Sequence, residues 1–100
     1  MAYINTSSEA SPYLHRFSVA EDASRVEQHI EQIRRQTKAA QRSAAEAFDK
    51  SADSHERTAT SYEKLAEQGQ HGASKHAGRH RKFAQEDRQI SRRLREMAET

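Results

Sequence analysis

A chain of 100 residues with 17 Lys and Arg, 15 Asp and Glu and a net charge of +2 has room for one domain with a modest core. The absence of cysteine excludes disulfides and thiolate zinc sites and favours a reducing compartment. No apolar run approaches the ~20 residues that span a bilayer, and the N-terminus lacks the pattern of a secretory signal. We therefore expect a cytoplasmic protein without a membrane anchor.

The composition favours helix throughout. Alanine, Glu, Gln, Arg and Lys are frequent, whereas the chain has one proline and three glycines. Residues 1–18 are rich in turn formers and contain the proline, so we expect an N-terminal arm there. Ser18 and Glu21 have the spacing of a capping box, which predicts a helix that begins at residue 19. No Gly or Pro follows until Gly69, so this helix is predicted over residues 19–68.

The stretch "GQHG" predicts a turn over residues 69–73, with Gly69 as a left-handed cap. Ser74 is placed to cap a second helix, predicted over residues 74–98. The two helices then form an antiparallel hairpin over residues 19–100. The predicted fold is therefore all-α, a long coiled-coil-like helical hairpin that dimerises into a helical bundle.

A three-helix bundle is the alternative fold. It requires a break at Ser43, where the sequence Ser-Ala-Ala-Glu repeats the capping-box spacing. We favour the uninterrupted helix, because no turn residue supports a break.

Folding the second helix back on the first sets one apolar stripe against another. The expected inner stripe of the first helix is Ala45, Phe48, Ala52, His55, Ala59, Tyr62 and Ala66. That of the second helix is His76, His80, Phe83, Asp87, Ile90, Leu94 and Met97. Most layers then pair an alanine with a larger residue, which fills a core without voids.

A ladder of ion pairs is predicted beside this core. It pairs Asp49, Glu56 and Glu63 of the first helix with Arg95, Arg88 and Arg81 of the second, in that order. The small residues between these arginines leave room for their side chains to cross the groove. Each exposed pair contributes at most ~0.2–1 kcal/mol.

The first helix carries a further apolar stripe that has no partner in the hairpin, and an exposed stripe of this kind must be covered. Its members are Val26, Ile30, Ile33, Thr37, Ala40 and Ala44. A twofold dimer would cover it by packing this part of the helix antiparallel on its copy, with Ile30 against Ala40. We therefore expect a homodimer, and this face is also the predicted contact for an unidentified protein partner.

His76 and His80 are four residues apart, so they share a helix face and could together bind a metal ion. A functional metal site takes three or four ligands, and the neighbours Tyr62 and Glu63 complete the set poorly. We therefore predict polar core histidines, with no metal and no cofactor.

His55 and Asp87 are predicted to face each other as a polar core pair joined by a charge-assisted hydrogen bond. Such a pair titrates, which makes pH-dependent stability an expectation. A metal- or pH-responsive hairpin is accordingly the third functional hypothesis for this chain.

The charge is unevenly distributed, since residues 1–67 hold nine basic and eleven acidic residues whereas residues 68–100 hold eight and four. This asymmetry suggests a nucleic-acid-associated helix as the second hypothesis. Its contact residues would be Lys75, Arg79, Lys82, Arg92 and Arg93. Aromatic residues for base stacking are nearly absent from this helix.

No motif of catalysis is present: no Gly-rich phosphate loop follows a strand and no nucleophile elbow occurs. We therefore do not expect an enzyme. The first hypothesis is a helical hairpin that self-associates and acts as an adaptor, scaffold or regulator for another protein.

The run "AAEAFDKSADSHERTATSYEKLAEQG" and the following "HAGRHRKFAQEDRQ" resemble a loose group of small uncharacterised actinobacterial helical proteins rich in Ala and His-Glu. The resemblance covers residues 44–89. It implies a helical hairpin in a bacterial protein and assigns no catalytic or binding residue.

Overall fold

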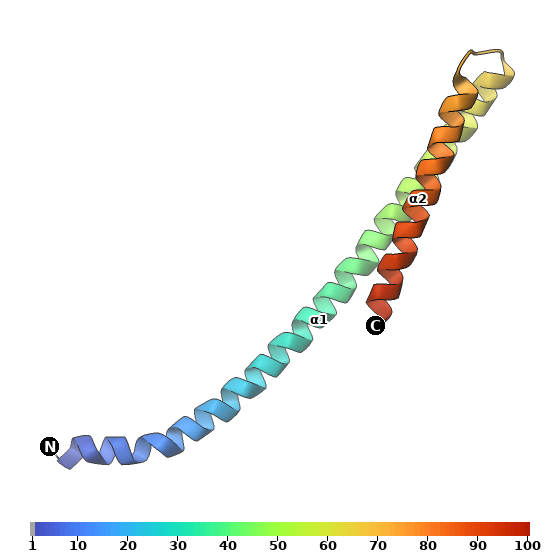
Figure 1. Ribbon diagram of the computed structural model, residues 1–100. Helices are drawn as coiled ribbons and strands as arrows, with labels where there is room; N and C mark the ends of the chain where they lie inside the picture. Colours follow the sequence, from blue (N-terminus) through green and yellow to red (C-terminus); the bar gives the residue numbers. More distant parts are fainter. Residues whose placement is uncertain (1) are drawn as a thin grey trace. The chain divides into compact units, whose positions relative to one another are not determined.

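The computed structural model describes the backbone of residues 2–100 and the side chains of residues 19–100. Within this range the chain forms two helices and no strand: α1 is Ala2–Glu67 and α2 is Ala73–Glu99 (Figure 1). Two units divide the chain, Met1–Gln36 and Thr37–Thr100. We call residues 2–36 of α1 the N-terminal segment and residues 37–100 the hairpin.

The beginning of α1 differs from the prediction. The helix begins at Ala2 rather than at residue 19, so the backbone of residues 2–18 is helical. A capping box is a local preference, whereas extending an existing helix adds one hydrogen bond for each residue fixed. The side chains of residues 1–18 lie outside the described residues.

The continuity of α1 through Ser43 is confirmed, and the alternative break at this residue is wrong. Residues 37–67 contain neither glycine nor proline. Repeated capping-box spacing does not end a helix whose backbone hydrogen bonds can simply continue.

Gly69 ends α1 as predicted, in a left-handed conformation with φ of 84°. The Gln70 amide donates to the Leu65 carbonyl at 3.0 Å, and the Gly69 amide donates to the Ala66 carbonyl at 3.0 Å. These two bonds define a Schellman motif, which satisfies carbonyls at the helix end. The turn then occupies residues 68–72.

The predicted cap of α2 is wrong. Gly72 is the N-cap, with φ of 82°, and no side chain caps the helix. The left-handed conformation of Gly72 redirects the backbone so that α2 begins at Ala73, one residue before Ser74. Ser74 therefore lies inside the first turn, where it cannot occupy the N-cap position.

Gly69→Ala should destabilise the hairpin by about 1 kcal/mol, because an L side chain is strained at positive φ. A Cβ atom there would meet nothing within 4 Å, so the cost comes from the backbone alone. Gly78→Ala is the matched control: it lies inside α2 with equally open space and should stabilise by ~0.5–1 kcal/mol. Urea unfolding would measure both, and the same sign for the two variants would contradict this account of the turn.

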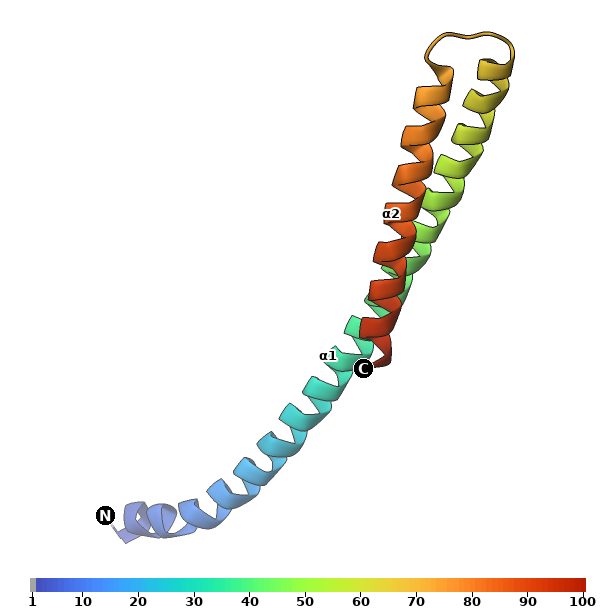
Figure 2. The same ribbon diagram turned by 45° about the vertical axis from the view of Figure 1, so that its right-hand side comes forward.

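The hairpin forms because α2 packs antiparallel along residues 37–67 of α1 (Figures 1 and 2). Its core is made of small side chains. The buried residues are Ala45, Ala52 and Ala59 of α1 and Ala73, Ala77, Ala84, Ser91 and Ala98 of α2. Most of them recur every seven residues, so each helix presents a narrow stripe of small residues. Two such stripes allow the helix backbones to approach closely.

The inner stripe predicted for α2 is therefore wrong in part. His80, Asp87 and Leu94 are half-buried, but Phe83, Ile90 and Met97, also expected in the core, are 44%, 38% and 53% exposed. The fully buried residues of both helices are small, whereas most layers were expected to pair an alanine with a larger side chain. Because small side chains occupy the contact between the two helices, the large side chains lie to one side of it.

Candidate interaction surfaces

One side of the hairpin carries the predicted ladder of ion pairs, which is confirmed. Arg95 Nη2 lies 2.7 Å from Asp49 Oδ2, and Arg88 Nη2 lies 3.0 Å from Glu56 Oε2. Arg81 pairs with Glu63. Arg88 also contacts Asp53 at 3.2 Å. The side chains are 37–56% exposed, so the ladder fixes the alignment of the helices more than it stabilises them.

Asp49 occupies the most constrained position of this ladder. Hydrogen bonds from the Ser91 hydroxyl and from Arg95 lower the pKa of Asp49 below its usual value. Ser91 is the buried polar member of the small-residue stripe on α2, with 2% exposure. The core and the ion-pair ladder are therefore joined through this carboxylate.

Asp49→Asn should lower the free energy of unfolding at pH 7 by less than ~1 kcal/mol, since the side chain is 39% exposed. A carboxyl group with a lowered pKa in the folded state stabilises above its unfolded pKa, and this stabilisation is lost as pH falls through the folded pKa. The difference between variant and wild type should therefore be present at pH 7 and shrink as the pH falls below the usual pKa of an aspartate. Urea unfolding over a series of pH values measures it, with exposed Glu46→Gln as the control; a difference that does not shrink in acid would contradict the assignment.

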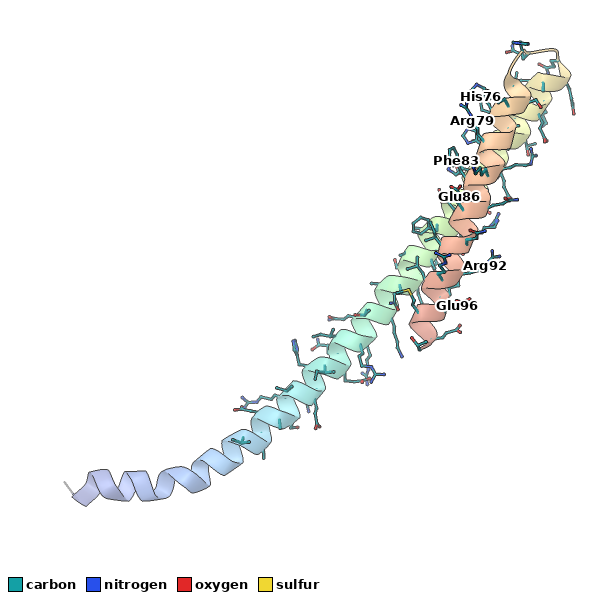
Figure 3. All side chains as sticks on the ribbon, in the orientation of Figure 1. His76, Arg79, Phe83, Glu86, Arg92 and Glu96 are labelled. Atoms are coloured by element: carbon teal, nitrogen blue, oxygen red, sulfur yellow. The ribbon has the colours of Figure 1, made fainter. Side chains whose placement is uncertain are left out.

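The opposite side of the hairpin carries a cluster of aromatic and histidine side chains. Tyr62 stacks on His76 and His80, with ring centroids 5.0 and 5.7 Å apart. The ring of His55 lies 5.3 Å from that of Phe83. Figure 3 labels His76 and Phe83, which lie seven residues apart along α2. We call this set of five rings the aromatic cluster.

The predicted hydrogen bond between His55 and Asp87 is not formed, although the two residues are neighbours. His55 Nε2 lies 4.0 Å from Asp87 Oδ2, beyond hydrogen-bond distance. Instead, His55 Nδ1 and His80 Nδ1 are 2.9 Å apart, so one ring donates to the other. Sequence reasoning missed this contact, because it assigned His80 to the layer of Tyr62.

Asp87 Oδ2 is buried and has no hydrogen-bond partner within residues 19–100. The neighbouring donor is His55 Nε2, which lies 4.0 Å from this oxygen. The side chain of His55 therefore lies between those of Asp87 and His80. In the part of the chain that the structure describes, no three His, Asp or Glu side chains are placed to hold a metal ion.

An exposed apolar edge begins at Phe83 of the aromatic cluster and continues along α2. Sequence reasoning missed this edge. We define it as Phe83, Ile90 and Met97, which recur every seven residues on α2. Half-buried Phe48 of α1 and Leu94 of α2 lie on the same side of the hairpin. The small-residue repeat of α2 was the signal that could have revealed this edge, because its members exclude large neighbours from the core.

The N-terminal segment presents a second exposed apolar surface. Val26, Ile30 and Ile33 of the predicted interaction face are 56%, 53% and 46% exposed, and Val19 is 52% exposed. We call these four residues the N-terminal stripe. The remaining members of the predicted face belong to the hairpin, where Thr37 and Ala40 are exposed and Ala44 is half-buried.

The basic residues predicted to contact nucleic acid are Lys75, Arg79, Lys82, Arg92 and Arg93, all exposed. None of them forms an ion pair with residues 19–100. Acidic residues divide the set, because Glu86 and Asp87 lie between Lys82 and Arg92. Figure 3 labels Glu86 between Arg79 and Arg92 along α2. The basic side chains therefore form two groups rather than one continuous strip for a phosphate backbone.

Within the described residues no helix is long and apolar enough to cross a membrane. Comparisons with known protein families, with curated proteins and with solved structures find no match for this chain. The two exposed apolar surfaces and the charges beside them are the features of residues 19–100 that point to a function.

Proposed function

We propose that this chain is a non-enzymatic helical interaction protein that self-associates and serves as a scaffold or regulatory adaptor. One observation carries the proposal: every member of the N-terminal stripe is at least 46% exposed. Large aliphatic side chains in series along one helix face gain about 1.5–3 kcal/mol each when they are buried. A second copy is the partner that every solution of the protein contains.

A scaffold must keep a folded part available to its client after it assembles. The hairpin has its own core of small residues and its own ladder of ion pairs. Its exposed basic residues, such as Lys75 and Arg79, remain free for a client with an acidic surface. On this proposal, client binding uses exposed basic residues of α2, whereas assembly uses exposed apolar side chains.

The test is the absolute mass in solution, measured by light scattering on a sizing column at low and moderate salt. We expect about twice the chain mass of 11.4 kDa at both salt concentrations, because apolar burial is weakly sensitive to screening of charge. A monomeric mass at all accessible concentrations would contradict self-association.

A further inference from the structure

Two exposed apolar series in this chain have equal spacing and equal length. The first comprises Val19, Val26 and Ile33 of the N-terminal stripe. The second is the apolar edge of the hairpin, Phe83, Ile90 and Met97. In both series the residues recur every seven positions, so each extends over about 21 Å of helix. Helices that pack side by side match apolar residues at this repeat, so each series is a suitable partner for the other.

The charges beside the two series are complementary. Residues 19–33 contain four acidic residues and one basic residue, whereas residues 82–93 of α2, which flank Phe83 and Ile90, contain four basic residues and two acidic ones. Arg88 is paired with Asp53 and Glu56. The other three, Lys82, Arg92 and Arg93, are exposed and form no ion pair with residues 19–100. An acidic helix that approaches this surface is therefore attracted to it.

We propose that the apolar edge of the hairpin is the docking site for residues 19–33 of a second copy of this chain. Val26 of one copy packs against Ile90 of the other, at the centre of both series. A twofold axis repeats the contact, so the apolar edges of both copies are covered by one reciprocal exchange. This inference rests on the proposed self-association and names the surface that it uses.

The apolar area that is buried favours this arrangement over pairing of the N-terminal stripe with its own copy. Self-pairing would bury Val26 and Ile30 but would leave Phe83, Ile90 and Met97 in water. The reciprocal exchange buries both series in one interface. Apolar burial is roughly proportional to area, so the arrangement that covers more exposed apolar surface is the more stable one.

Disulfide trapping tests the proposal, and the absence of cysteine from the chain makes single-cysteine variants unambiguous. Val26→Cys, made on a chain with a size tag, is mixed with untagged Ile90→Cys under mild oxidation. We expect a mixed disulfide, because a bond requires Cα atoms within ~7 Å. The control mixture uses Gln89→Cys in place of Ile90→Cys. Gln89 is an exposed neighbour on another face of α2, so this mixture should yield much less product.

A second mixture separates this inference from the function on which it rests. Val26→Cys with Ala44→Cys would be trapped if two N-terminal stripes pair antiparallel with each other. That result, without a Val26 to Ile90 product, would overturn docking on the hairpin and leave self-association intact. A monomeric mass of the wild type would overturn both.

Ile90→Glu provides a measurement that does not depend on oxidation. The side chain is 38% exposed, so the hairpin should still fold, as circular dichroism would verify. We expect the dimer to weaken at least ~10-fold, because one buried aliphatic contact is lost in each half of the interface. Gln89→Glu introduces the same charge beside it and should dimerise like the wild type. Dimerisation of Ile90→Glu with wild-type affinity would overturn the docking site.

Discussion

Replacing Ala84 by leucine should lower the melting temperature of the hairpin by about 10 °C or more. Ala84 is 1% exposed and lies in the stripe of small residues where α2 approaches α1. Leucine adds three carbon atoms at this fully buried position. Either the helices must separate or the leucine side chain must leave the interface. Overpacking of this kind typically costs ~1–3 kcal/mol, a large part of the stability of a small domain.

Two variants make this prediction specific to the interface. Ala47→Leu is the same substitution at an exposed position of α1 and should change the free energy of unfolding by less than ~0.5 kcal/mol. Ala84→Ser should be tolerated, because Ser91 already occupies the equivalent position one heptad later. Thermal and urea unfolding followed by circular dichroism would measure all three. Equal melting temperatures for Ala84→Leu and Ala47→Leu would contradict a core of closely packed small residues.

Replacing Ile30 by glutamate should weaken self-association by ~10²–10⁴-fold. Ile30 is 53% exposed in the single chain, so its contribution depends on what covers it in the assembly. Burying an isoleucine contributes about 1.5–3 kcal/mol, and a twofold dimer loses two of them. The loss of ~3–6 kcal/mol corresponds to the stated change in dissociation constant.

The matched control is Gln28→Glu, which adds the same charge on the opposite face of the helix, at an exposed position two residues earlier. It should dimerise like the wild type. Analytical ultracentrifugation over a range of concentrations would compare the two variants, with circular dichroism to verify that helix content is unchanged. Unchanged dimerisation of Ile30→Glu would remove the N-terminal stripe from the interface.

The helical character of this chain, the position of its turn and the ion-pair ladder could be predicted from residue type and spacing. Gly69 has no side chain to oppose a left-handed conformation, so its effect is local and visible in the sequence. The ladder was equally accessible, because any antiparallel register that pairs Asp49 with Arg95 also pairs Glu56 with Arg88. Heptad spacing carries such a register along the whole hairpin.

The start of α1 and the cap of α2 could not be predicted by the same means. Ser18 and Ser74 both have sequence contexts typical of caps. Whether a serine caps a helix depends on whether the backbone before it leaves the helical conformation. At Ser74 the left-handed conformation of Gly72 had already settled where α2 begins, so the serine lies within the helix.

The sequence by itself determined that two helices form, where the chain turns, and which charges pair across the hairpin, because each of these depends on local conformation or on a fixed heptad interval. Only the tertiary structure decided which stripe of α2 is buried. Ala84 and Phe83 are adjacent, and hydrophobicity alone favours the larger side chain for the core. Close approach of two helices favours the smaller one, and this choice leaves Phe83, Ile90 and Met97 exposed.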